Sequence, residues 1–175
     1  LNYYKKLKKR ISEKFMQKYF DKKIKNDFKI KGIPDHMKNQ YGAYYILPSY
    51  NFKRCGTFYL NIHKYYENYK YIAWTLILHE GNPGHHYQLT YNLENKVPKF
   101  ILYNGMANLF NSYVEGWGLY VESLTHEYFG DSNKKEEIDF RYGCYEYDKM
   151  RALRLVIDTG IHYYGWKYKK CSDLF

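Results

Sequence analysis

The sequence begins with hydrophobic residues at helical spacing. Leu7, Ile11, Phe15 and Tyr19 recur every four residues, and lysines lie between them. Residues four apart share one face of a helix, so this pattern predicts a basic amphipathic helix over residues 1–30. Its lysine face is expected to lie in solvent.

The rest of the chain combines helical patterns with one pair of short strands. Segments 43–52 and 57–63, rich in Tyr, Ile and Phe, flank a turn at 53–56 and predict the strands. Helical patterns cover residues 66–80, 84–91, 98 onward, 103–128 and 139–164. We therefore expect a single, mainly α domain over residues 1–175, with a small β-strand pair.

The net charge of +10 raises the question of a nucleic-acid partner. Because the N-terminal lysines follow helical spacing, the pattern favours a solvated helix face over a phosphate-binding arm, and we predict no nucleic-acid partner. The 24 tyrosines are typical of AT-rich codon usage, with a tyrosine-rich binding surface as the alternative. No apolar run reaches the ~20 residues of a membrane span, so we predict no such span.

Three cysteines lie far apart, at Cys55, Cys144 and Cys171. They form neither a disulfide framework nor a Cys-x-x-Cys metal site. This usage favours a reducing compartment such as the cytoplasm.

The stretch LHEGNPGHHYQ, residues 78–88, holds the first candidate chemistry. On a regular helix His85 would point ~120° away from His79, and His86 would lie ~10 Å along the axis, so neither could share a metal with it. Pro83 and Gly84 interrupt such a helix. They either end it or form a wide turn that returns His85 or His86 to His79.

A zinc site would need a third ligand of histidine or carboxylate type and one open position. Glu115 and Glu122 lie seven residues apart, on one face of an apolar helical segment. We interpret Glu115 as a ligand, whereas Glu122 is either an exposed acid or a group that orients the ligands. Glu80 would then be the general base that accepts a proton from the attacking water.

A polar stripe occupies the last long helical pattern. Arg151, Arg154, Asp158 and His162 follow at intervals of three, four and four. The stripe is either solvated or buried along a cleft. In the second case His162 would donate to a developing oxyanion, oriented by Asp158, and an arginine would bind a substrate carboxylate.

Three motifs together carry a family resemblance: LHEGNPGHHYQ, YVEGWGLYVESL and RLVIDTGIHYYGW. In this order they resemble the bacterial family called domain of unknown function 885. Its members look like helical zinc peptidases, distantly similar to the thimet-oligopeptidase and Taq-carboxypeptidase type. The resemblance implies a helical zincin-like catalytic region and a chain that is a fragment of a longer domain.

The resemblance also assigns roles. It makes His79, His85 and Glu115 the ligands of one zinc ion, Glu80 the base and His162 a substrate-facing group. His86, Asp158 and Glu122 would support these residues without touching the metal.

For the substrate, the resemblance implies that strand residues 56–61 line the cleft and pair their free edge with an extended peptide. Arg54, Tyr59, Asn61 and Arg154 would contact that peptide. The family typically has Arg-Pro-Gly where this chain has Arg54-Cys55-Gly56, a change in a turn that affects no expected ligand.

We therefore predict zinc-dependent hydrolysis of peptide bonds, of carboxypeptidase or oligopeptidase type. One alternative is a truncated or degenerate, non-catalytic basic binding module. The other is a helical-bundle iron or manganese carboxylate protein, which is disfavoured because no Glu-x-x-His pair lies near the expected site.

Overall fold

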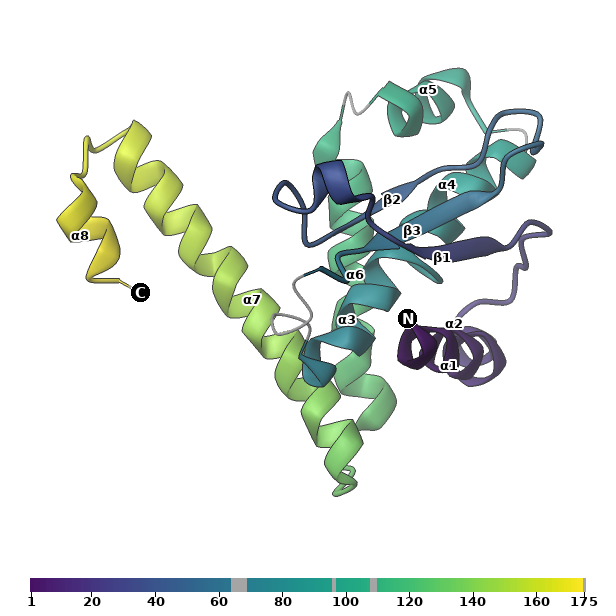
Figure 1. Cartoon of the computed structure of the whole chain (residues 1–175), viewed down its shortest axis with the longest axis horizontal. Coiled ribbons are helices and arrows are strands. Elements are labelled where there is room, and N and C mark those ends of the chain that lie inside the picture. Colours follow the sequence, from purple (N-terminus) through teal and green to yellow (C-terminus); the bar gives the residue numbers. More distant parts are fainter. Residues whose placement is uncertain (64–68, 96, 108–109, 175) are drawn as a thin grey trace.

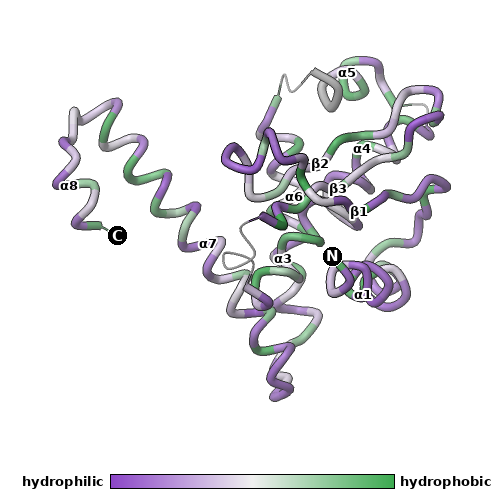
Figure 2. Tube along the Cα trace, viewed as in Figure 1, coloured by the Kyte–Doolittle hydropathy of each residue, from purple (hydrophilic) through white to green (hydrophobic). Residues whose placement is uncertain are grey.

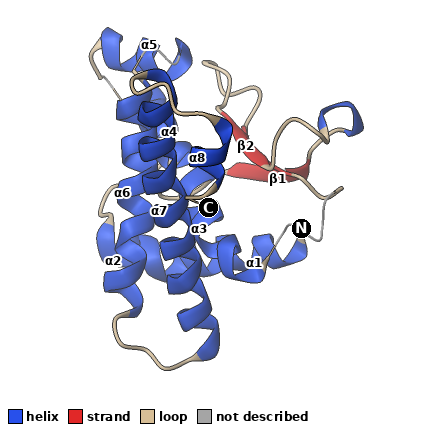
Figure 3. Cartoon of the chain, turned by 90° about the vertical axis from the view of Figure 1, so that its left-hand side faces the viewer, coloured by secondary structure: helices blue, strands red, loops and turns tan. Residues whose placement is uncertain are grey.

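A computed structural model describes residues 1–63, 69–95, 97–107 and 110–174. Helices dominate, and a small sheet lies beside them (Figures 1 and 3). The mainly α class is therefore confirmed.

The N-terminal helix buries Leu7, Ile11 and Phe15 of the predicted apolar stripe, with Tyr19 half-buried, but it is shorter than expected. It runs through α1 (Asn2–Arg10), a π-helical segment (Ile11–Phe15) and α2 (Met16–Tyr19). The expectation of helix to residue 30 is wrong, because β1 (Phe28–Gly32) follows. The Glu94 carboxylate accepts hydrogen bonds from the backbone N–H groups at 25 and 26, which fixes the chain in a turn ahead of the strand.

The sheet has three strands in the order β1-β3-β2. The expected pair is present as β2 (Ala43–Ile46) and β3 (Gly56–Leu60), which run antiparallel. The third strand, β1, pairs in parallel with the other side of β3. The prediction of a free edge at residues 56–61 is therefore wrong, since β3 is the central strand and β2 is an edge.

In the described part of the chain, six helices follow the sheet: α3 (Lys70–Glu80), α4 (His85–Glu94), α5 (Lys99–Ala107), α6 (Asn111–Phe129), α7 (Lys135–His162) and α8 (Tyr168–Ser172). The helix expected from residue 66 is seen from Lys70, and residues 66–68 lie outside the described part. The single helix expected over 103–128 is two, α5 and α6, because Phe110 has a non-helical backbone with φ −128° and ψ 80°. Residues 108 and 109 lie outside the described part.

Helix α3 is the centre of the core. Trp74 is fully buried and stacks on Phe140 of α7 at 5.0 Å between ring centroids, while Phe15 packs against its edge. Figure 2 shows α3 as largely hydrophobic and α1 as largely hydrophilic. Since α3 packs against α1, α6 and α7, its C-terminal residues His79 and Glu80 are held in a fixed position.

The distal half of α7 and α8 stand away from this body (Figure 1). Between Arg151 and Leu174, the buried residues are Gly160 and Cys171. No helix in the described ranges has both the length and the apolar character needed to cross a membrane.

Candidate metal centre

The turn between α3 and α4 reverses the chain so that two histidines meet. Gly84 is required there, because a Cβ at this position would overlap the carbonyl oxygens of Leu78 and His79. The Pro-Gly pair therefore forms the wide turn instead of simply ending a helix. It places the ring of His85 4.5 Å from that of His79, with the two planes at 80°.

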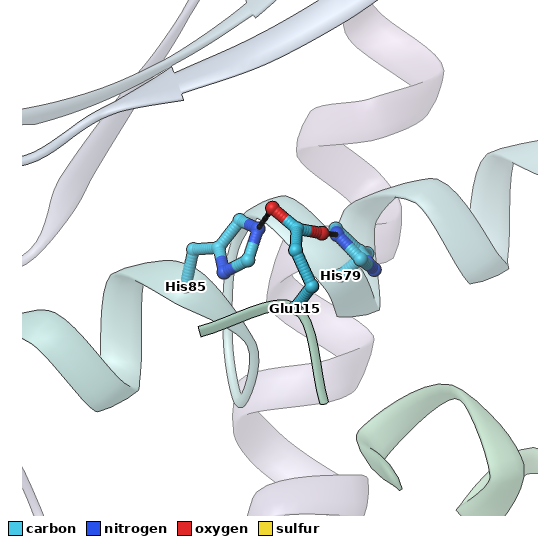
Figure 4. Close-up of side chains that lie close together, drawn as sticks. All are labelled: His79, His85 and Glu115. Atoms are coloured by element: carbon cyan, nitrogen blue, oxygen red, sulfur yellow. Dashed lines mark hydrogen bonds and ion pairs between the residues drawn. The ribbon is translucent and has the colours of Figure 1, made fainter. Parts of the chain in front are cut away.

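Glu115 of α6 completes a three-residue cluster (Figure 4). Its carboxylate lies between the imidazoles, with Oε2 3.2 Å from Nε2 of His79 and Oε1 3.6 Å from Nε2 of His85. One potential ligand atom from each residue lies within 4.8 Å of the others. The residues expected to bind zinc are thus gathered at one point.

Glu122 supports this cluster from behind. Its side chain is 1% exposed, so the alternative of an exposed acid is wrong. Oε1 accepts a hydrogen bond of 2.5 Å from Nδ1 of His79, and both carboxylate oxygens accept from Arg151, at 2.6 and 2.9 Å. With Nδ1 occupied in this way, Nε2 of His79 is directed toward Glu115, the arrangement by which carboxylates orient metal-binding histidines.

Helix α6 approaches His79 at a glycine that sequence analysis missed. A Cβ on Gly118 would lie 2.5 Å from Cε1 of the His79 ring, so a larger residue would displace the imidazole. Trp117 fastens the same helix to the turn by donating to the carbonyl of Pro83 at 2.7 Å. The Glu-Gly-Trp-Gly sequence was the available signal for this close approach.

Electrostatics make the cluster suitable for a cation. Burial alone would lower the pKa of His79, but hydrogen bonds to Glu115 and Glu122 raise it to about 9. The two carboxylates thus favour a positive charge at this point, and a metal ion bound there would take the place of the ring proton on Nε2. Burial and the charge of His79 lower the pKa of His85, which leaves that imidazole neutral and able to bind a metal.

Glu80 is 9% exposed and adjoins the cluster. Burial raises the pKa of its carboxyl to about 7, with the nearby charge of His79 acting in the opposite direction. A carboxyl group with a pKa near neutrality can both accept and return a proton.

The cluster lies in a cleft formed by two adjoining hollows of about 480 and 350 Å³. Both are lined by His79, Glu80 and Glu115. Tyr147 and Arg154 of α7 line the larger hollow, and β2 with the start of α6 lines the smaller one. A ligand entering from solvent therefore reaches the cluster from either side.

The family model described as "Bacterial protein of unknown function (DUF885)" matches residues 1–175. This chain belongs to the DUF885 family. It is also similar to the crystal structure of "the putative lipoprotein from Colwellia psychrerythraea", with 27% sequence identity and a TM-score of 0.85. That similarity covers 99% of this chain and 29% of the other, so this chain spans less than a third of its relative's length. No curated protein shows significant similarity to this chain.

His86 of the DUF885 chain is fully buried, and its ring nitrogens bond Tyr45, Asn26 and Thr90 instead of the three clustered residues. Its Nε2 donates to the carbonyl of Asn26 at 3.0 Å, which leaves Nδ1 to accept from the Tyr45 hydroxyl at 2.8 Å. Burial lowers the pKa of His86 to about 4, so the ring stays neutral. The expected supporting role is thus corrected: His86 positions Tyr45, which lines the smaller hollow.

The polar stripe of α7 is split between the cleft and solvent. Arg151 binds Glu122 and Arg154 lines the larger hollow, as a cleft-facing stripe requires. Asp158 and His162 lie farther along the helix, 3.6 Å apart, with side chains 77% and 76% exposed. The structure does not bring His162 or Asp158 to the cluster, because α7 continues past the cleft into solvent.

The expected substrate-binding residues on and near β3 are only partly at the cleft. Asn61 lines the larger hollow, but its amide nitrogen donates to the carbonyls of Lys38 and Tyr41 and so holds a loop. Arg54 is exposed in the turn before β3, and Tyr59 stacks on a neighbouring tyrosine of β2. Neither of these two residues lines either hollow.

Proposed function

We propose that this DUF885 chain carries the centre of a zinc-dependent peptidase. The observation that carries the proposal is the convergence of His79, His85 and Glu115 beside buried Glu80 in an open cleft. Two imidazoles and one carboxylate are a ligand set typical of catalytic zinc. Nε2 of His85 lies 3.6 Å from the Glu115 carboxylate, so this nitrogen is the one placed to bind the metal.

When bound, a zinc ion supplies Lewis acidity, which makes water nucleophilic near neutral pH and polarises a carbonyl group. Glu80 accepts the proton of the attacking water and then delivers it to the leaving amine as the C–N bond breaks. Glu122 and Arg151 keep the His79 ring fixed while charge develops.

The Tyr147 hydroxyl replaces His162 in the proposed stabilisation of the oxyanion. Tyr147 lines the larger hollow and Tyr45 the smaller one. Burial raises the pKa of Tyr147 to about 12, so its hydroxyl stays protonated and can donate a hydrogen bond. The Tyr45 hydroxyl already donates to Nδ1 of His86.

The substrate would lie along β2 instead of β3. Asn61 N–H donates to the carbonyl of Gly42 at 2.8 Å, and antiparallel alternation then turns the backbone groups of Ala43 and Tyr45 away from β3. Both residues line the smaller hollow, so an extended peptide can add to this edge beside the cluster. Arg154, across the cleft on α7, is suited to bind a substrate carboxylate.

Zinc analysis combined with a peptide-hydrolysis assay tests the proposal. Zinc-loaded protein is expected to hold metal at the cluster and to cleave peptides, and His79→Ala is expected to lose both properties. Glu80→Gln should keep the zinc and lose activity by a factor of about 10²–10⁴. Less than about a tenth of an equivalent of zinc at this centre, or a fully active Glu80→Gln variant, would overturn the proposal.

A further inference from the structure

A second group of potential metal ligands lies between α6 and α7, outside the cleft. His126 follows Glu122 by one helical turn on α6, and it meets Cys144 and Asp148, which are four residues apart on α7. One potential ligand atom from each of the three lies within 4.8 Å of the others. None of the three belongs to the candidate centre at His79.

The imidazole of His126 is the unusual member of this group. Both ring nitrogens are buried, and neither has a hydrogen-bond partner among the described residues. The ring of Tyr145 covers it at 4.2 Å between centroids. Burying polar nitrogens without partners costs free energy, and a cation held by one of them would remove part of this cost.

Of the other two residues, Cys144 lies in the protein interior and Asp148 lies at the surface. Cys144 is fully buried, and its sulfur lies 3.3 Å from the carbonyl oxygen of Glu122. Asp148 has a side chain 53% exposed and lies 3.6 Å from Nη1 of Arg151, so a solvated ion can reach the group from this side. Nitrogen, sulfur and oxygen donors together favour zinc over magnesium or calcium, which prefer oxygen alone.

We propose that His126, Cys144 and Asp148 form a second zinc site that clamps α6 to α7. Ligand atoms around tetrahedral zinc lie roughly 3.5 Å apart, so the group would contract by about 1 Å on binding. The thiol proton passes to solvent as the sulfur binds the ion, and the fourth position is open to water. The proposal does not rest on peptide hydrolysis, since the site shares no ligand with the first centre.

The clamp would act at the point where the first centre is supported. Cys144 contacts the backbone of Glu122, and Asp148 is paired with Arg151, the two residues that hold His79. The second ion is therefore a positioning element for that pair. Its loss should weaken the contact between α6 and α7 without removing a ligand of the first centre.

Cobalt(II) substitution tests the second site, because only a thiolate ligand gives an intense near-ultraviolet charge-transfer band. The first centre contains no sulfur, so the band reports on the second site alone. Cobalt-loaded wild type should show the band and bind two equivalents. The His79→Ala variant should keep the band and bind one equivalent, which separates this result from a failure of the first centre.

Two variants and one control complete the test. Cys144→Ser should lose the band and one equivalent, whereas Cys55→Ser, in the turn before β3, should keep both. Asp148→Asn changes an exposed residue and avoids disturbing the core, and it should weaken cobalt binding at this site at least tenfold. Absence of the band from fully loaded wild type, or its persistence in Cys144→Ser, would overturn the proposal.

Discussion

Glu122 is the residue on which the geometry of the candidate centre most depends. It is almost fully buried and is bound on one side by His79 and on the other by Arg151. A buried carboxylate is tolerated because these partners compensate its charge. The effects of substitutions at these three positions are therefore expected to be non-additive.

Replacing Arg151 tests this dependence. Arg151→Ala leaves the Glu122 carboxylate without its bidentate partner, and we expect it to lower the free energy of unfolding by about 3 kcal/mol. Arg154→Ala is the matched control on the same helix, where the side chain is exposed and the expected loss is below about 0.5 kcal/mol. Urea denaturation measures both, and equal losses in the two variants would contradict the expectation.

Two glycines of α6, Gly118 and Gly116, provide a test and a matched control for the packing of this helix against the His79 ring. In Gly118→Ala the new methyl group would displace the imidazole, and we expect zinc affinity at the first centre to fall about 10–100-fold. In Gly116→Ala the methyl group meets no atom within 4 Å, so affinity should be unchanged while helix propensity improves. Isothermal titration with zinc distinguishes them, and unchanged affinity in Gly118→Ala would count against this packing.

At the scale of elements, periodicity predicted the helices and one strand pair, because apolar residues at fixed spacing must share a buried face. The wide turn was one of two alternatives, and the resemblance was needed to choose between His85 and His86. The course of residues 25 and 26 into β1 was missed, since Glu94, which holds them, lies far away in sequence. The placement of His162 failed for a similar reason, because periodicity does not say where α7 leaves the cleft.

The attachment of the turn at residues 25 and 26 to α4 should depend on pH. Although burial alone would raise the pKa of Glu94, hydrogen bonds from Lys25 and Asn26 lower it below its ordinary value. A lowered carboxyl pKa in the folded state stabilises the protein above the unfolded pKa, ~4.3, and this contribution is lost as pH falls through the folded value. Glu94→Gln should therefore be less stable than wild type at pH 7 by about 1 kcal/mol, with the difference shrinking below about pH 4.

Denaturation at several pH values checks this prediction. Glu13→Gln is the control, since Glu13 is exposed and makes a salt bridge to Lys9 at 3.8 Å. Its effect should stay within about 0.5 kcal/mol at every pH. A Glu94→Gln deficit that is constant from pH 7 to pH 3 would rule out the proposed linkage.

At the scale of the whole molecule, the first centre joins three helices that are separate in the sequence. His79 lies in the last turn of α3, His85 begins α4 and Glu115 lies near the start of α6. A metal held by all three can bind only the folded chain, so its binding free energy adds to the stability of the whole fold. The distal part of α7, which stands outside this arrangement, should gain little from it.

Chelation should therefore lower the melting temperature. With free zinc at about 1,000 times its dissociation constant, the stabilisation is about 4 kcal/mol, or roughly 10 °C for a chain of this size. The measurement is best made by calorimetry on Cys144→Ser, so that only the first centre is loaded. His85→Ala in the same background should have the same melting temperature with and without chelator. A melting temperature that chelator still lowers in this variant would contradict the assignment of His85 as a ligand.

The open edge of β2 has a consequence for handling the protein. Backbone groups that are free to receive a peptide are equally free to receive a strand from another molecule, which is a familiar route to aggregation. The exposed tyrosines beside this edge offer further apolar surface for such a contact. An extended peptide that occupies the edge would then keep concentrated samples monodisperse.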